Sequence, residues 1–244
     1  MNKKIACIIT ASISVILFVY VNSNINKKTI KTYSNSRSLY SFTIVKDEFI
    51  EEYEIKLKEL EELRIKEEQE RIERELQLLR EKEIEEERIR NVTYEASNLL
   101  ITSGLKEEEL YEILPQSMKH LAYSIVGAER QYGISAFFIT SIAALESNWA
   151  TSSRAKYSNN LTGMAVYGDD SPGTYYNSQY ECIYDTARQL KKYYLSSDGI
   201  FHNGYSSYSV NINYCTSSDW YIKIDKIAYE LLDKYDKIFR GNLW

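Results

Sequence analysis

Glu146 is the residue in this chain whose position best suits acid–base chemistry. It follows an apolar segment, residues 134–145, whose large side chains recur at helical spacing, and Ser135 can cap the start of that helix. The sequence thus predicts a carboxylate on the last turn of a core-facing helix, next to Trp149. Burial and the negative end of the helix dipole both raise the pKa of a carboxyl group there. A carboxylic acid that stays protonated near neutral pH can act as a general acid, although most glutamates at helix ends are simply solvated.

Two further polar and aromatic motifs follow the glutamate. The stretch around Glu146 reads ALESNWATSS at residues 144–153, NNLTGM occupies residues 159–164, and YCTSSDW occupies residues 214–220. Between the second and third motifs lies a tyrosine-containing loop with a Pro-Gly pair. One glutamate in a helix is weak evidence for a catalytic site, but several motifs in a fixed order are specific.

This order of motifs resembles the bacterial glucosaminidases of glycoside hydrolase family 73. That family typically has A-x-L-E-[ST]-x-W-G-[ST]-S, then N-N-x-x-G-[IM], an A-Y-D-x-x-P stretch, and Y-A-[ST]-D-P-x-W. The resemblance covers roughly residues 115–240. It implies an α-helical, lysozyme-like domain with a small loop or hairpin lobe, which hydrolyses the β-1,4 bond after N-acetylglucosamine in peptidoglycan.

The resemblance also implies roles for individual residues. Glu146 matches the catalytic acid of the family, and Tyr214 matches its tyrosine facing the cleavage site. The remaining matched positions shape the substrate groove or pack around it, and they are Trp149, Asn160, Gly163, Tyr167 and Trp220.

The chain departs from the family pattern at three places. Ala150 replaces a glycine, which is harmless if its backbone φ is negative. Thr162 replaces an aromatic residue, so we expect an altered sugar-stacking surface. Ser217 and Ser218 replace Asp-Pro, which removes a carboxylate near Tyr214.

The second catalytic group is left open by the sequence. Glycosidases usually use two carboxylates, and Asp169 and Asp170 lie in a loop that can cross the groove. These two residues can equally be ordinary loop aspartates beside a Pro-Gly turn. The acetamido group of the substrate is a third alternative, and Tyr214 would then orient that group.

The N-terminal part of the chain differs in kind from the rest. Lys3 and Lys4 precede an uncharged run at residues 5–21, which favours an uncleaved single-pass membrane anchor at 1–23 over a cleaved signal peptide and a secreted protein. Either reading places the remainder outside the cytoplasm, facing the cell wall. After a linker at 24–45, residues 46–103 are expected to form a helical stalk.

Composition supports this division. All nine glycines and both prolines lie at or beyond Gly104, so the region before it lacks the residues that make tight turns. Apolar residues of the stalk recur at steps of three, four and seven among interleaved charges, a pattern typical of a coiled-coil dimer or of a single solvated helix. The catalytic domain is therefore expected at 104–244, mainly α-helical.

Several other functions are disfavoured. The net charge is −5 and no segment of the domain is strongly basic, so nucleic acid is not an expected partner. His120 and His202 lack metal-ligand spacing, and we expect neither a metal nor a cofactor. Cys182 and Cys215 are expected to be separate thiols rather than a disulfide.

Helix signals complete the expected domain. They predict a helix over 105–114, one from Pro115 to Tyr132 ended by Gly133, one after Ser178 up to 195, and one over 218–239. Two alternative functions stay open beside the glucosaminidase. One is a lytic transglycosylase acting on the same glycan, and the other is a non-catalytic wall-binding or scaffold protein.

Overall fold

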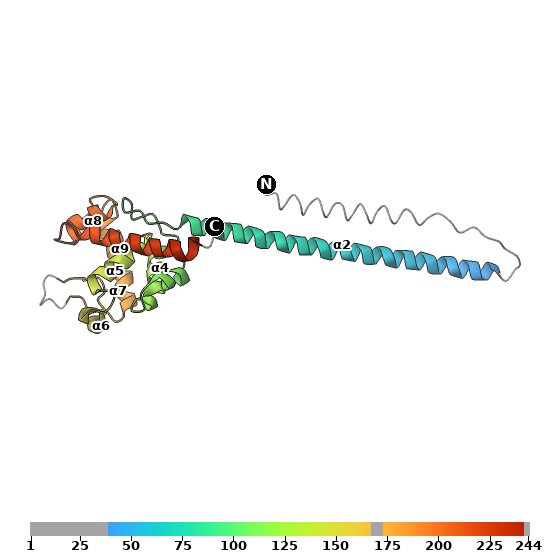
Figure 1. Cartoon of the computed structure of the whole chain (residues 1–244), viewed down its shortest axis with the longest axis horizontal. Helices are drawn as coiled ribbons and strands as arrows, with labels where there is room; N and C mark the ends of the chain where they lie inside the picture. Colours follow the sequence, from blue (N-terminus) through green and yellow to red (C-terminus); the bar gives the residue numbers. More distant parts are fainter. Residues whose placement is uncertain (1–38, 167–172, 242–244) are drawn as a thin grey trace. The chain divides into compact units, whose positions relative to one another are not determined.

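The computed structural model describes residues 39–166 and 173–241, with the side chains of 39–49 excepted (Figure 1). The expected membrane segment at residues 5–21 and most of the expected linker lie outside the described residues. Among the helices that are described, none is both long enough and apolar enough to cross a bilayer.

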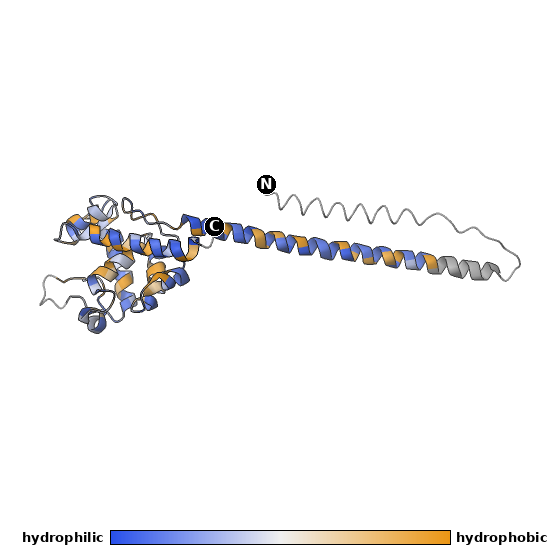
Figure 2. Cartoon of the chain, viewed as in Figure 1, coloured by the Kyte–Doolittle hydropathy of each residue, from blue (hydrophilic) through white to orange (hydrophobic). Residues whose placement is uncertain are grey.

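The expected stalk is helical. Helix α2 (Leu39–Asn91) runs without a break through the charged region and ends well before residue 103, where the sequence placed the end of the stalk. Its apolar side chains alternate with long hydrophilic stretches (Figure 2), and Tyr53, Leu57 and Leu60 are exposed in the single chain. Such exposure suits either a solvated helix or one that pairs with a second copy, so the coiled coil stays a prediction.

The chain forms two compact units, residues 1–73 and 74–244. The second unit is built from short helices, and among the described residues it contains no strand. These elements are α3 (Glu107–Ile113), the 3-10 turn η1 (Lys119–Leu121), α4 (Ala122–Tyr132), α5 (Ala136–Ser147), α6 (Ser153–Ser158), α7 (Gln179–Gln189) with the π-helical turn η2 (Leu190–Tyr194), α8 (Ser207–Tyr214), and α9 (Trp220–Tyr235) with the π-helical turn η3 (Asp236–Arg240).

Helix α5 is the centre of this unit. Its large side chains Phe137, Phe138, Ile139 and Ile142 are fully buried, and the helix packs against α4, α7 and α9. A helix that is apolar all round must be covered on all sides, which explains its central place. The last turn of α5 then carries Glu146 out of the core.

The start of α5 is fixed by a buried carboxylate. Glu129 accepts hydrogen bonds from Ala136 N (2.7 Å), Ser103 N (2.6 Å) and Ser103 Oγ (2.9 Å). The predicted cap by Ser135 is wrong, since its hydroxyl makes no cap hydrogen bond and is buried without a partner in the described structure. Gly133 ends α4 with a left-handed φ of 63°, as the sequence predicted.

The segment after α2 belongs to the core. Val92, Tyr94 and Leu99 are buried in the same apolar cluster as α5, although the sequence assigned them to the stalk. The guanidinium group of Arg240 donates to backbone carbonyl oxygens of residues 89, 90 and 92. It thereby satisfies carbonyls that a helix end leaves unpaired.

Other differences from the predicted elements are local. The helix expected from Pro115 begins only at Ala122, after a 3-10 turn. Helix α7 starts as predicted, because Ser178 accepts a hydrogen bond from Glu181 N (3.1 Å). Helices α6 and α8 were not predicted. Of the expected loop or hairpin lobe, the described residues around 159–164 and 173–177 form loop structure.

Candidate active site

The carboxyl group of Glu146 is held by the first residue of α9. Trp220 is 2% exposed, and its indole Nε1 donates a hydrogen bond to Glu146 Oε1 over 2.8 Å. Phe138 of α5 packs edge-on against the Trp220 ring at 6.3 Å between centroids, which fixes the orientation of the indole. The sequence placed both residues in the site, and the structure brings them into direct contact.

The environment of Glu146 suits a general acid. The residue is exposed at the end of α5, yet the protein surrounding its carboxyl group raises the pKa by desolvation. The hydrogen bond from Trp220 lowers the pKa but does not cancel the effect of burial. The acid is thus kept protonated to a higher pH than a solvated glutamate, while one side of the residue stays open to a substrate.

The loop at residues 159–164, here called the glycine loop, lies against Oε2, the other oxygen of the Glu146 carboxyl group. Gly163 has φ +67°, and a Cβ atom there would lie 3.4 Å from Glu146 Oε2. Only glycine adopts this backbone conformation without strain, so Gly163 brings a bare backbone up to the acid.

Asn160 shapes this loop from within. Its side chain is buried, with Nδ2 donating to the carbonyl oxygens of Met164 and Thr174 (both 3.0 Å) and Oδ1 accepting from Met164 N (3.0 Å). The carboxamide is therefore fully used in holding the loop together. Its position agrees with a groove-shaping role rather than with direct contact to a sugar.

Thr162 does not form part of a sugar-stacking surface. The side chain is buried and its hydroxyl pairs with Thr186 Oγ1 of α7 at 2.7 Å. Thr162 therefore provides no ring for a sugar to stack on, and the expectation that this substitution alters the stacking surface stays a prediction.

Tyr214 joins the glycine loop to the tryptophan. Its hydroxyl donates to Thr162 O (3.2 Å), and its ring lies 4.7 Å from the Trp220 ring, tilted by 31°. Burial, followed by the nearby charge of Glu146, raises the pKa of Tyr214 well above its ordinary value. The tyrosine therefore stays protonated and serves as a hydrogen-bonding group, not as a base.

The turn after α5 has an unusual backbone. Asn148, Trp149 and Ala150 have φ values of 50°, 57° and 62°, so three consecutive residues other than glycine are left-handed. The condition under which Ala150 would be harmless, a negative φ, is not met. A glycine is suited to this position because L-residues pay about 1–2 kcal/mol in the left-handed region. Trp149 is half-buried and packs against the core beside Glu146.

The turn before α9 keeps its shape without Asp-Pro. Asn211 Nδ2 donates to the carbonyl oxygen of Ser217 (2.9 Å), and the Ser217 hydroxyl bonds to the Asp219 carboxylate. A carboxylate is thus present near this turn, at Asp219 instead of 217. Asn211 was not predicted as a positioning residue, and no sequence motif marks it.

Three predicted site residues cannot be placed. Tyr167, Asp169 and Asp170 lie outside the described residues. Among the groups that are described, no second carboxylate contributes to the pKa shift of Glu146. The described residues also contain no cluster of three or more His, Cys, Asp or Glu side chains suited to a metal ion.

The histidines and cysteines take ordinary structural places. His120 Nε2 pairs with Gln179 Oε1 (2.7 Å), and His202 Nδ1 pairs with Tyr194 O (2.8 Å). Cys182 and Cys215 are free thiols, and Cys182 Sγ accepts from Leu161 N at 3.3 Å.

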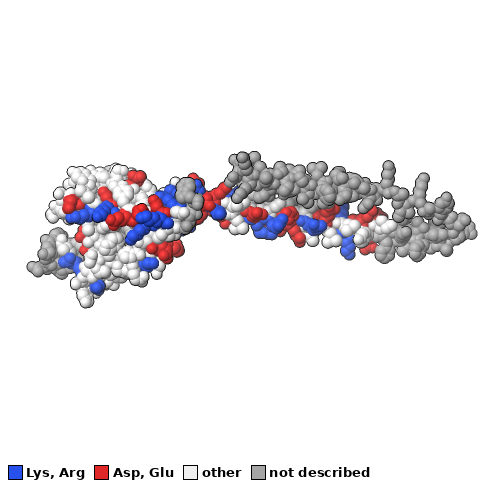
Figure 3. All heavy atoms as spheres, viewed as in Figure 1, with Lys and Arg blue, Asp and Glu red and all other residues white. Residues whose placement is uncertain are grey.

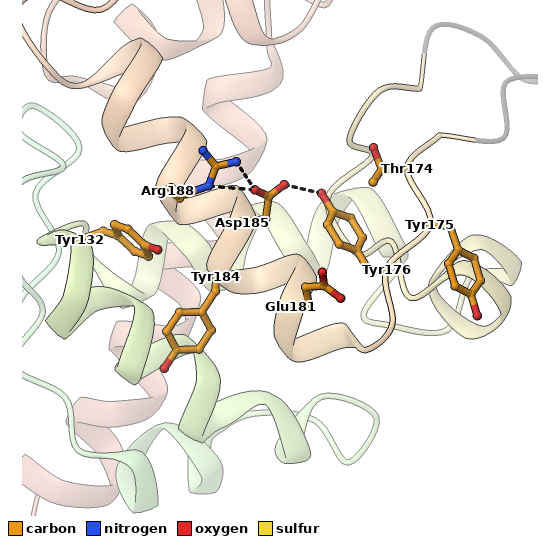
Figure 4. Close-up of a pocket in the computed structure, with 8 residues that line it drawn as sticks. All are labelled: Tyr132, Thr174, Tyr175, Tyr176, Glu181, Tyr184, Asp185 and Arg188. Atoms are coloured by element: carbon orange, nitrogen blue, oxygen red, sulfur yellow. Dashed lines mark hydrogen bonds and ion pairs between the residues drawn. The ribbon is translucent and has the colours of Figure 1, made fainter.

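A separate hollow lies along α7 (Figure 4), and neither Glu146 nor Trp220 lines it. It has a volume of about 380 Å³ and is lined at its ends by Tyr132 and Tyr175. At its centre Asp185 accepts hydrogen bonds from Tyr176 (2.9 Å) and Arg188. Burial opposes ionisation of Asp185, but these hydrogen bonds lower its pKa overall. Asp185 and Arg188 neutralise each other, and the carboxylate of Glu181, which also lines the hollow, accepts hydrogen bonds from Asn177.

Residues 122–233 match the glucosaminidase family, whose description is mannosyl-glycoprotein endo-β-N-acetylglucosaminidase. This region belongs to the glucosaminidase family. The domain is accordingly a glycoside hydrolase, and the matched range contains Glu146, Asn160, Gly163, Tyr214 and Trp220.

Solved structures similar to this chain include three of autolysin E from Staphylococcus aureus. A catalytic mutant in complex with the disaccharide NAG-NAM is 15% identical (TM-score 0.48), covering 62% of this chain and 77% of that one. A complex with the muropeptide NAM-L-Ala-D-iGlu is 16% identical (TM-score 0.48), and autolysin E itself is 18% identical (TM-score 0.47). Both cover 62% of this chain and 76% of theirs. A comparison with curated proteins gives no match.

The surface of the glucosaminidase domain is electrically mixed. Acidic and basic side chains lie side by side on the face drawn in Figure 3. Along α9 and its two ends they form pairs one turn apart, such as Lys223 with Asp219 before α9 and Asp233 with Lys237 of η3. Such pairs are exposed and contribute little to stability.

Proposed function

We propose that this protein is a peptidoglycan hydrolase that cleaves the β-1,4 bond after N-acetylglucosamine, with Glu146 as the general acid. The observation that carries the proposal is the placement of Glu146 between the indole of Trp220 and the bare backbone of Gly163, with a raised carboxyl pKa. The match of this region to a glucosaminidase family supports the same reaction.

The first step follows from this geometry. Glu146 gives its proton to the glycosidic oxygen as the bond between that oxygen and the anomeric carbon breaks, and the electron pair of the bond stays on the departing oxygen. Glu146 is left as a carboxylate. The hydrogen bond from Trp220 Nε1 strengthens when its acceptor becomes charged, so it stabilises the product of proton transfer more than the starting acid.

The positive charge that develops on the sugar needs a second group. We propose two sources: a carboxylate from Asp169 or Asp170, or the acetamido group of the substrate oriented by Tyr214. The hydroxyl of Tyr214 already donates its hydrogen to Thr162 O, so its oxygen is available to accept a hydrogen bond from the amide N–H of a substrate.

The decisive experiment compares the native protein with Glu146→Gln on purified peptidoglycan. The glutamine keeps an oxygen that can accept from Trp220, so the fold should survive while activity falls by about 10²- to 10⁴-fold, the usual contribution of general acid–base catalysis. Glu181→Gln, on the exposed surface of α7, is the matched control and should keep full activity. A Glu146→Gln protein as active as the native one would remove the proposed mechanism.

Product analysis separates hydrolysis from the alternative reaction. Mass spectrometry of the digest should show fragments ending in reducing N-acetylglucosamine. Fragments with an anhydro-muramyl end would instead identify a lytic transglycosylase. No clearing of wall material by the native protein would favour a non-catalytic scaffold.

We further propose that residues 1–23 anchor the enzyme in the membrane, with α2 as a spacer and the catalytic domain facing the wall. Lys3, Lys4 and the uncharged run at 5–21 support this placement. Cell fractionation should find the full-length chain in the membrane fraction, and a chain without residues 1–23 in the soluble one. Recovery of a shortened native protein from the medium would indicate signal cleavage instead. Sedimentation of residues 39–244 would show whether α2 pairs two copies.

A further inference from the structure

Aromatic rings continue outward from the candidate active site in an unbroken series. The Tyr214 ring, which stacks on Trp220, also lies 5.7 Å from the ring of Tyr194, and Tyr194 lies 5.2 Å from the ring of Phe201. Exposure rises along the series from 2% at Trp220 to 38% at Phe201. We call Tyr194 and Phe201 the outer aromatic pair.

The outer aromatic pair does not belong to the motifs that resemble the glucosaminidases. Tyr194 is the last residue of the π-helical turn η2, and Phe201 lies in the connection between η2 and α8. Neither residue was selected by the sequence, because each is one of many aromatic residues in a tyrosine-rich chain.

The backbone that carries Phe201 is firmly held. Phe201 N donates to Tyr193 O (2.9 Å), and Phe201 O accepts from Asn203 Nδ2 (3.1 Å) and Asn213 Nδ2 (3.3 Å). At Gly199 a Cβ atom would come within 2.5 Å of Tyr193 O, so the turn leaves no room for a side chain. A ring presented on such a backbone loses little conformational entropy when a ligand covers it.

Exposed apolar side chains are common on protein surfaces, and single ones need no explanation. The outer aromatic pair differs by its continuity with the residues around Glu146. Tyr208, by comparison, is more exposed at 58%, but its ring packs on Tyr221 and is not part of the series.

We propose that the outer aromatic pair is a stacking surface for the glycan strand beyond the cleaved bond, an additional subsite that extends the active site. The proposal rests on the proposed function. One face of an amino sugar ring presents C–H groups, and aromatic rings provide large, rigid apolar area for such a face. The pair touches no reacting atom, and we expect its interaction with the glycan to be the same in the substrate complex and in the transition state.

The test is a comparison of Phe201→Ala with the native enzyme on glycan strands separated by length. On long strands KM should rise about tenfold with kcat unchanged, the result of losing an interaction worth about 1.4 kcal/mol in both states. On the shortest strands that are cleaved, the two proteins should have equal KM values. The alkaline limb of the pH profile should not move, since no group next to Glu146 changes. Tyr208→Ala is the matched control and should behave as native on all strands.

Two further variants keep the result interpretable. Phe201→Trp should restore a low KM on long strands, because it restores an aromatic face. If Phe201→Ala fails to fold, Phe201→Leu keeps much of the apolar volume without the ring and should show the same rise in KM. An unchanged KM on long strands for these variants, or a fall in kcat with a shifted pH profile, would overturn the stacking surface.

A failure of the proposed subsite can be distinguished from a failure of the proposed function. Binding of strands can be measured in the inactive Glu146→Gln background, with and without Phe201→Ala. Weaker binding of the double variant supports the subsite even if the catalytic step differs from the one proposed. Equal binding overturns the subsite but leaves the hydrolase assignment standing. A native protein that does not cleave peptidoglycan would overturn the proposed function by itself.

Discussion

Trp220 Nε1 donates to Glu146 Oε1 over 2.8 Å, which joins the last turn of α5 to the first residue of α9. The two residues are 74 positions apart in the chain. This bond opposes the effect of burial on the carboxyl pKa and fixes the direction in which the acid points. One interaction therefore links the packing of two helices to the position of the proposed general acid.

Replacing the indole should change the pH dependence of the enzyme. Trp220→Phe removes a hydrogen bond that lowers the pKa of Glu146, so this pKa should rise further. A general acid works in its protonated form, and its protonated range then extends upward. The alkaline limb of the pH profile of kcat/KM should move to higher pH, while the maximum of kcat falls because the carboxylate product loses its donor.

Trp149→Phe is the matched control for this measurement, because it leaves the Trp220–Glu146 bond in place. The alkaline limb of the pH profile of Trp149→Phe should lie at the same pH as that of the native protein. If the alkaline limb of Trp220→Phe is unchanged, or moves to lower pH, Trp220 does not set the pKa of the proposed general acid.

Ala150→Gly should stabilise the protein. Ala150 has φ 62°, and the strain of about 1–2 kcal/mol exceeds the roughly 0.4–1 kcal/mol of extra chain entropy that glycine loses on folding. The free energy of unfolding should rise by about 1 kcal/mol, seen as a higher urea midpoint with an unchanged slope. Ala155→Gly, in helix α6, should lower the midpoint instead. A lower midpoint for Ala150→Gly would mean that the methyl group contributes more by packing than it costs in strain.

The sequence predicted the parts of this site that follow from local patterns. The apolar run before Glu146 predicts α5, and the left-handed Gly133 and the cap at Ser178 follow from rules that involve a few neighbouring residues. The family resemblance selected Tyr214 and Trp220, which the structure places together at the acid.

Long-range features could not be read from the sequence. The cap of α5 comes from Glu129 rather than from the adjacent Ser135, because folding brings a buried carboxylate to the helix start. The strain at Ala150 depends on a turn in which Trp149 N bonds to Ala144 O, and no local propensity predicts three left-handed residues. Helix α2 ends at Asn91 without a nearby glycine or proline, and Val92 and Tyr94 then pack in the core. Tertiary contacts end this helix where no local helix-breaking residue marks its end.

Asn160→Ala should loosen the glycine loop. The change leaves the Thr174 carbonyl and the Met164 N–H without their Asn160 partner in a partly buried place, while the Met164 carbonyl keeps only its hydrogen bond from Thr174 N. We expect a loss of about 2 kcal/mol in stability, the cost of leaving buried polar groups unpaired. Activity should fall as Gly163 moves away from Glu146, without a large shift of the pH profile, because Trp220 and the burial by α9 stay.

Asn160→Asp is the informative companion. It keeps an acceptor for Met164 N but places a carboxylate oxygen against two carbonyl oxygens, so it should be at least as destabilising as alanine at neutral pH. Recovery of stability in acid, where the carboxyl group regains a hydrogen to donate, would identify the lost donor as the cause. Near-native urea midpoints and activity in both variants would show that the loop is held by other contacts.

Glu129 provides a last test, of how the fold positions the acid. Glu129→Ala would leave Ser103 N, Ala136 N and the hydroxyl hydrogen of Ser103 without an acceptor in the core, so we expect a loss of about 3 kcal/mol in the free energy of unfolding. Glu129→Gln can accept from both N–H groups through its one oxygen, and its amide can donate to the Ser103 oxygen, so only the hydroxyl hydrogen of Ser103 loses its acceptor. The glutamine should therefore cost less than half as much as the alanine. Urea midpoints of the two variants decide the matter, since equal losses would mean that the charge of Glu129, and not its acceptor geometry, holds the start of α5.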